Sequence, residues 1–404
     1  MLSEGTDGVR VRAGRATGVA FAALIALNLL NYVDRNLLPG ALPVVKQASG
    51  LSDSRLGTLN SMFFVAYMVG GPALGWLGDR FSRRMLIGTA VCLWSVALWL
   101  FTVVHGGPGA FAAYMMVGGC EAAFGVYAVT LLSDYFPGRS GNTALGRFFL
   151  AMIAGRSAGH MLGGFLATTF GWRAPFRVLA GTGLLAGIAA LGVLFDPRRD
   201  GAAGSARVEI SRPQLAASLL RRPYVLAVLG LAMQTFASGG LAVWLPTYLS
   251  RYAGYSPGRA TAVTGLATLV AGLSGTALGS MLGERLMERD SRDPYRLSAV
   301  SLLLGALCVA AILTPWPHVV IFGVFATQFV LFLNIGPLNL ALLRAAPPEI
   351  RSTAVAAALV AIHLLGDAPS PQVIGMLSDA YDLRIGLLPV PLALLAGASL
   401  LACA

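Results

Sequence analysis

Apolar stretches of about 18 or more residues recur along this chain, from near residue 16 to its end. Each is long enough to cross the hydrocarbon core of a bilayer as a helix. Because lipid offers no hydrogen-bond partner to a backbone, a spanning segment must be a helix or part of a closed barrel. The stretches are continuous rather than alternating, which favours helices. Only 12% of the 404 residues are charged, too few to cover the surface of a water-soluble protein of this length. The sequence therefore predicts an all-α membrane protein.

The apolar stretches predict twelve spans in two halves. One long polar stretch, rich in Arg, Gly, Ala and Ser, separates the sixth span from the seventh. We therefore expect a six-helix bundle at 1–195, a cytoplasmic linker at 196–222 and a second six-helix bundle at 223–404. The spans are expected at 16–45, 55–78, 84–104, 108–136, 140–170, 174–195, 223–252, 257–287, 294–315, 317–345, 349–381 and 384–403.

Basic residues outside the spans are unevenly distributed. Most lie in segments on the same side as the N-terminus. Segments rich in Lys and Arg stay on the cytoplasmic side, so both termini are expected to be cytoplasmic. The net charge of +11 is then mostly a topology signal, and no nucleic-acid role is expected. The bias toward Ala, Gly and Arg, with almost no Lys, hints at a bacterial chain and hence at the plasma (inner) membrane. Nothing indicates an obligate oligomer, so a monomer is expected.

The two halves resemble each other. The segment 75–80 closes the second span, and the similar segment 280–285 closes the eighth. Arg139 and Gly163 of the fifth span have counterparts at the same spacing in Arg351 and Gly375 of the eleventh. Two pseudo-symmetric six-helix bundles describe the major facilitator architecture, whose substrate path runs between the halves.

The segment between the second and third spans resembles the signature of major facilitator transporters. An acid at a helix end can pair with a basic group or with a helix N-terminus of the neighbouring bundle, in one access state only. The alternative is that its arginines only anchor the topology. The residues expected to act in gating are Gly75, Asp79, Arg80, Arg83 and Arg84.

Asp34 and Arg35 lie in the first span with apolar sequence on both sides. Charges at this depth are costly and normally face the bundle interior or a water-filled cavity. Adjacent residues on a helix are about 100° apart, so these two are expected to reach different partners. Glu121, centred in the fourth span, is the other deep acid of the first half. The hypothesis is that Asp34 and Glu121 exchange protons; the alternative is a static charge network between the first and fourth spans.

Further polar groups occur in the fifth, tenth and eleventh spans. Arg156 and His160 are one helical turn apart, and so are His363 and Asp367. Arg156 could bind an anionic headgroup or neutralise a deep acid. His363 and Asp367 could form a second protonatable pair or hold helices together. The segment 334–339 places a Gly-Pro break between Asn334 and Asn339, which would free backbone carbonyls that must line protein or a cavity.

An enzyme-like pattern and the cysteines carry no chemistry. Residues 155–159 match G-x-S-x-G, but that motif needs a turn from a strand to a helix, and this segment is expected to be a continuous helix. Small residues for close helix packing explain its glycines better. The four cysteines have unrelated spacings, so neither a disulfide framework nor a metal site is expected, and no cofactor is implied.

Five segments together resemble the spinster family of the major facilitator superfamily. The resemblance covers about residues 28 to 380, and its segments are 31–35, 121–122, 170–173, 332–339 and 363–371. It implies transport of lysolipids such as lysophospholipids or sphingosine-1-phosphate, with proton coupling. By position, it implies protonation at Asp34 and Glu121 and headgroup contact at Arg35. Tyr114 stands where the family usually has an arginine, so two alternatives remain open: the basic partner of the phosphate is Arg35 or Arg156, or the substrate differs from that of the family.

The leading hypothesis is therefore a proton-coupled secondary transporter for a lysophospholipid or related amphipathic lipid. The alternative is a proton-coupled transporter of a small organic anion or drug-like compound. A third reading, a lipid-sensing receptor without net transport, is disfavoured by the gating signature. The residues expected to contact substrate are Arg35, Tyr114, Arg156, His160, Asn334, Asn339, His363 and Asp367.

Overall fold

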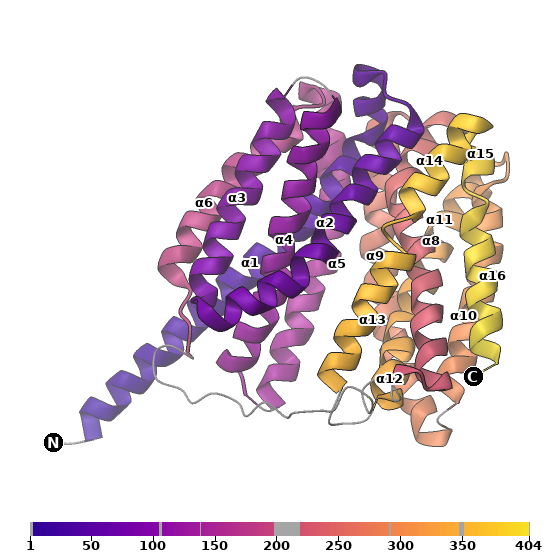
Figure 1. Ribbon diagram of the computed structural model, residues 1–404. Coiled ribbons are helices and arrows are strands. Elements are labelled where there is room, and N and C mark those ends of the chain that lie inside the picture. Colours follow the sequence, from indigo (N-terminus) through magenta and orange to yellow (C-terminus); the bar gives the residue numbers. More distant parts are fainter. Residues whose placement is uncertain are drawn as a thin grey trace. The chain divides into compact units, whose positions relative to one another are not determined.

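The computed structural model describes residues 3–104, 107–137, 139–197, 219–290, 292–346 and 351–403. Within these ranges it describes the helix but not the side chains at 3–15, 71–73, 75–76, 79, 139, 142 and 351–352. Every regular element of the described residues is a helix (Figure 1). The helices are α1 (Ser3–Ser49), α2 (Asp53–Arg80), α3 (Arg83–Val103), α4 (Gly107–Tyr135), α5 (Arg139–Phe170), α6 (Ala174–Val193), α8 (Arg222–Tyr252), α9 (Pro257–Arg289), α10 (Asp293–Ile312), α11 (Pro317–Leu333), α12 (Ile335–Ala345), α13 (Arg351–Leu365), α14 (Ser370–Ala380), α15 (Leu383–Gly386) and α16 (Pro389–Ala402).

The twelve expected spans account for these helices. The first nine each correspond to one helix, and the last three each correspond to a pair: α11 with α12, α13 with α14, and α15 with α16. Ten segments of the described chain are long and apolar enough to cross a membrane. The linker expected at 196–222 lies largely outside the described residues.

Prolines explain the breaks within the later spans. Pro337 has no N–H, so it cannot donate to the carbonyl of Leu333, and the helix breaks at Asn334, just before the expected Gly-Pro pair. The eleventh span breaks between Leu365 and Ser370 for the same reason, since Pro369 lies within the interruption. The break in the tenth span was expected from its Gly-Pro pair, whereas the break in the eleventh was not; each span is still one stretch long and apolar enough to cross a membrane.

A glycine in the left-handed backbone conformation follows each of three long helices. Gly50, Gly171 and Gly254 follow α1, α5 and α8 with φ of 64°, 88° and 73°, which is the left-handed region. A residue without a Cβ adopts this conformation at little cost and so terminates a helix.

The chain forms two compact units, which we describe separately. Unit 1 comprises Met1–Arg35, Ala66–Arg156 and Arg173–Ser205, and in it α3 packs on α4 and α6. Unit 2 comprises Asn36–Val65, Ser157–Trp172 and Ala206–Ala404, and in it α8 packs on α12, α13, α14 and α16, while α9 packs on α11 and α12. Three helices, α1, α2 and α5, contribute to both units.

Small residues allow α1 and α5 to pack closely. Within unit 2, a Cβ on Gly40 would lie 2.6 Å from the carbonyl oxygen of His160, and within unit 1 a Cβ on Gly155 would lie 2.6 Å from that of Leu29. The helix α5 is continuous over 155–160. This confirms that the G-x-S-x-G pattern is a helix-packing surface.

Candidate functional site

The first candidate cluster lies in unit 1, where α1 meets α4. The Nε and Nη2 atoms of Arg35 each lie 3.4 Å from Oε2 of Glu121. Arg35 is 12% exposed and the Glu121 side chain is fully buried. The guanidinium also lies 4.9 Å from the ring centre of Tyr32 and 4.6 Å from that of Tyr67. Arg35 is thus held by one carboxylate and by two aromatic rings, whose faces attract a cation.

Asp34 lies in the same unit but has a different partner. The indole Nε1 of Trp94, on α3, donates a hydrogen bond of 3.1 Å to Oδ2 of Asp34, which is 1% exposed. The prediction that Asp34 and Arg35 reach different partners is confirmed. However, Arg35 pairs with Glu121, whereas Asp34 is held by a neutral donor and has no ion pair among the described residues.

Three buried polar atoms of this cluster lack a hydrogen-bond partner within the described protein. They are Nδ2 of Asn31, Oδ1 of Asp34 and Oε1 of Glu121. Buried polar groups are nearly always satisfied by protein or by ordered water, so orphaned atoms of this kind indicate a functional site. We refer to Asn31, Asp34, Arg35, Trp94 and Glu121 as the charge cluster. It holds two buried acids and a single cation, an arrangement with room for a proton.

Two other expected contact residues of unit 1 are Tyr114 and Arg156. Tyr114, in the place of the family's usual arginine, is 2% exposed and packs against Phe101 with a ring separation of 5.4 Å. The Arg156 side chain is half-buried and close enough to Tyr32 for its charge to act on the phenol.

The remaining expected contact residues lie in unit 2. The Nε2 atom of His160 is 2.9 Å from the carbonyl oxygen of Ala242, on α8. Nδ1 of His363, on α13, is 3.0 Å from Oδ2 of Asp367, so the two side chains meet as expected, although Asp367 lies in the turn after α13 and not on the helix. The His363 ring also stacks on Phe64 at 6.3 Å.

The two asparagines around the helix break differ. Asn334 is fully buried and donates a hydrogen bond of 2.6 Å to Oε1 of Gln234, while its own Oδ1 has no partner. Asn339 is partly exposed, and its Nδ2 donates to the carbonyl of Ile335, one turn earlier in α12. Asn334 therefore joins α8 to the break, whereas Asn339 bonds within its own helix.

The expected gating segment has one strongly anchored member. Arg83 is 2% exposed, and its Nη2 lies 2.5 Å from Oδ1 of Asp196 and 2.7 Å from Oδ2 of Asp134. The backbone N–H of Arg83 also donates to Asp196, at 2.8 Å. Thus Arg83 ties the start of α3 to the ends of α4 and α6 within unit 1. Among the other members, Arg80 is exposed and Arg84 is half-buried with an Nε that has no described partner, while at Gly75 and Asp79 the structure describes only the helix.

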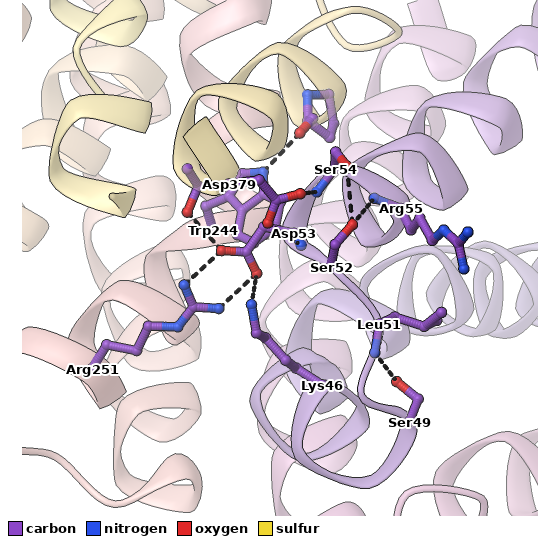
Figure 2. Close-up of polar contacts among 12 residues, drawn as sticks. Lys46, Ser49, Leu51, Ser52, Asp53, Ser54, Arg55, Trp244, Arg251 and Asp379 are labelled. Carbon is purple, nitrogen blue, oxygen red and sulfur yellow. Dashed lines mark hydrogen bonds and ion pairs between the residues drawn. The ribbon is translucent and has the colours of Figure 1, made fainter. Parts of the chain in front are cut away.

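Sequence reasoning missed a polar cluster in unit 2 at the beginning of α2 (Figure 2). Asp53 accepts hydrogen bonds from Nη1 and Nη2 of Arg251, at 2.6 and 2.7 Å, and from Oγ of Ser378, at 2.6 Å. The chain's single lysine, Lys46, also pairs with Asp53. Residues of α1, α2, α8 and α14 therefore converge on one carboxylate. The only sequence signal was the excess of charge at the ends of spans, which does not indicate which charges meet.

Comparison with known proteins agrees with this architecture. Residues 24–371 match the family model described as Major Facilitator Superfamily. Protein spinster homolog 1 of Xenopus laevis is 30% identical over 391 residues, which cover 88% of this chain and 72% of that protein. The sphingosine-1-phosphate transporter SPNS2 of Danio rerio is 29% identical over 388 residues, covering 90% and 76%.

A solved structure supports the same fold. It is that of a bacterial homolog of the human lysosomal transporter Spinster, in an inward-facing and occupied conformation. It matches this chain with a TM-score of 0.82 and 19% identity, over 95% of each chain. The chain therefore belongs to the major facilitator superfamily and, within it, to the spinster family of multi-pass membrane transporters.

Proposed function

We propose that this chain is a secondary transporter that works by alternating access and couples proton movement to transport of a lysophospholipid or a related amphipathic lipid. The observation that carries the proposal is the charge cluster, in which one buried acid, Glu121, pairs with Arg35 and a second, Asp34, accepts a hydrogen bond from the neutral indole of Trp94. Such charges inside a membrane protein are costly and are retained at ion and substrate pathways.

Protons are proposed to act on Asp34 and Glu121. Among the described residues, Asp34 accepts a hydrogen bond from the indole of Trp94 and has one oxygen without a partner, which can carry a proton without breaking an ion pair. Glu121 is the partner of Arg35, so a proton on Glu121 would remove the charge that holds the guanidinium. The two acids are therefore proposed to have different roles: Asp34 binds a proton, and protonation of Glu121 releases the guanidinium of Arg35.

The headgroup is proposed to bind Arg35 once Glu121 is neutral. A guanidinium offers a planar set of donors that suits a phosphate, and the rings of Tyr32 and Tyr67 would hold it flat. The relative from Danio rerio is named as a transporter of sphingosine-1-phosphate, a lipid with a phosphate headgroup, which favours this class of substrate. Further contacts are proposed for Tyr114, Arg156, His160, Asn334, Asn339, His363 and Asp367.

Alternating access is proposed to use contacts at opposite ends of the helices. At the end where α2 begins, Asp53 joins Arg251 within unit 2. At the other end, the segment with Gly75, Asp79, Arg80, Arg83 and Arg84 would act as the gate. In the proposed orientation both termini are cytoplasmic in the plasma (inner) membrane, so the Asp53 cluster faces the outside. The working unit is proposed to be a monomer.

Uptake into proteoliposomes with labelled lysophospholipid tests the proposal. With an imposed pH gradient, the wild-type chain should accumulate lipid above the level reached without the gradient. Asp34→Asn should bind the lipid but lose gradient-driven accumulation, because the amide cannot exchange a proton. Asp290→Asn is the matched control, since Asp290 is an exposed acid between α9 and α10.

Three other results of the uptake experiment would each contradict one part of the proposal. Accumulation by Asp34→Asn at the wild-type level would exclude Asp34 as a coupling site. Lipid binding without flux would favour the receptor reading. Gradient-driven uptake of small organic anions but not of lysolipids would favour the alternative substrate class.

A further inference from the structure

The first turn of α2 takes half of its N-terminal capping from another helix (Figure 2). The first four N–H groups of any helix have no partner inside it. In α2, Ser52 is the N-cap: its Oγ accepts from the N–H of Arg55, at 3.3 Å, while its carbonyl accepts the first ordinary helical bond, from the N–H of Leu56 at 3.1 Å. The N–H groups of Asp53 and Ser54 remain. They donate to Oδ1 and Oδ2 of Asp379, near the end of α14, at 2.9 and 2.8 Å.

The capping carboxylate comes from far away in sequence, 325 or 326 positions after the groups it binds. Glycines allow this approach within unit 2. A Cβ on Gly375, one turn before Asp379, would overlap the carbonyl of Asp53, and a Cβ on Gly57 would overlap that of Pro371. The two backbones are thus as close as glycine permits.

We propose that Asp379 is a state-specific N-cap of α2, which closes this end of the transporter independently of the ion pair between Asp53 and Arg251. A carboxylate at a helix N-terminus is stabilised both by hydrogen bonds and by the helix dipole. When α2 and α14 separate, Asp379 moves away from two N–H groups that no side chain of α2 itself satisfies. The closed state gains this interaction and the open state loses it.

The inference rests on alternating access as proposed above. The chain offers a matched control for the removal of the Asp379 carboxylate. Asp382 lies three residues after Asp379 and also caps a helix, accepting from the N–H of Ile385 at 2.9 Å. That helix is the short α15 of the same segment, so the Asp382 cap does not join α14 to α2. Removing either acid changes the charge at this end equally, but only Asp379 reaches α2.

The test uses a chain whose four native cysteines are replaced. Spin labels are attached at Arg55→Cys, an exposed site on α2, and at Trp316→Cys, an exposed site just before α11, and the distance between the two labels is measured. Pulsed electron resonance in lipid nanodiscs then gives the ratio of open to closed molecules without any substrate. Asp379→Ala should raise this ratio about five-fold, the typical value of one N-cap. Asp379→Asn keeps an acceptor oxygen and loses the charge, so it should raise the ratio about two-fold. Asp382→Ala should leave it unchanged.

The outcomes separate the two proposals. If Asp379→Ala and Asp379→Asn both leave the ratio at the wild-type value while Arg251→Ala raises it, the capping role is overturned and alternating access stands. An equal rise in Asp382→Ala would also overturn it, since charge alone would then explain the effect. If no variant, including Arg251→Ala, populates an open state, alternating access at this end fails. Melting temperatures measured alongside show that each variant is folded, and the conservative Asp379→Asn variant replaces Asp379→Ala if the latter does not fold.

Discussion

The guanidinium of Arg35 lies 3.4 Å from Glu121, 4.9 Å from the ring centre of Tyr32 and 4.6 Å from that of Tyr67. This contact joins the first helix to the fourth, with Arg35 only 12% exposed and Glu121 fully buried. In the proposed function, a substrate anion binds this arginine by displacing the Glu121 carboxylate. Competition between a carboxylate and a headgroup for one cation is a direct way to link a proton to a lipid.

Arg35→Lys tests whether the shape of this cation matters. Lysine keeps the charge but loses the planar group that lies near two rings and binds a phosphate with two donors. We expect lysophospholipid uptake to fall about ten-fold, mainly through a higher KM, measured in proteoliposomes. Arg259→Lys is the control, because Arg259 also lies over a tyrosine ring, that of Tyr255 at 4.8 Å, but belongs to unit 2, whereas the charge cluster belongs to unit 1. Equal losses in the two variants, or none in either, would contradict the role of Arg35.

Arg83 is expected to be a stability anchor as well as a member of the gating segment. Its guanidinium lies between the carboxylates of Asp134 and Asp196 and is 2% exposed. Removing one partner of a buried ion pair leaves an uncompensated charge and costs roughly 3–5 kcal/mol. Arg83→Ala should therefore lower the melting temperature in detergent by several degrees.

Arg296 supplies the control for Arg83. It also lies near two aspartates, 3.0 Å from Asp293 and 3.7 Å from Asp290, but its side chain is 63% exposed. Exposed ion pairs contribute about 0–1 kcal/mol, so Arg296→Ala should scarcely change the melting temperature. If Arg83→Ala were as stable as Arg296→Ala, the buried pair would not anchor unit 1.

The two cations on Asp53 are expected to contribute unequally to closure. Arg251 makes two hydrogen bonds to the carboxylate, in the bidentate arrangement that is strongest for this pair, whereas Lys46 makes one and is 32% exposed. With the labels described above, Arg251→Ala should raise the ratio of open to closed molecules more than Lys46→Ala does. Arg259→Ala, which removes a cation near the same end but not on Asp53, should have no effect. A larger rise in Lys46→Ala would reverse the assignment.

Local rules predicted the features that depend on neighbours in sequence. The contact of His363 with Asp367 follows from their separation of four positions, although Asp367 lies just after the end of α13, and the divergence of Asp34 and Arg35 follows from the helical angle. Pro337 predicted the helix break near Asn334, because a proline cannot donate a backbone hydrogen bond.

Contacts over long separations were not accessible in the same way. Asp53 meets Arg251 across 198 positions and Arg83 meets Asp196 across 113. A single sequence gives the charges and their approximate depth in the membrane, but many pairings satisfy the same pattern. The choice among them depends on helix packing, which small residues such as Gly57 and Gly375 determine by allowing close approach.

Close packing of α1 on α5 provides the last prediction, since one helix carries both the test and its control. A Cβ on Gly40 would lie 2.6 Å from the carbonyl oxygen of His160 and 2.9 Å from that of Gly159, so Gly40→Ala must push the two backbones apart. Such overpacking typically costs about 1–3 kcal/mol, and the melting temperature should fall accordingly. Gly18, on the same helix, has nothing within 4 Å of a Cβ, so Gly18→Ala should be neutral or slightly stabilising, because alanine favours a helix over glycine. A neutral Gly40→Ala would mean that α1 and α5 are not held at this distance in the membrane.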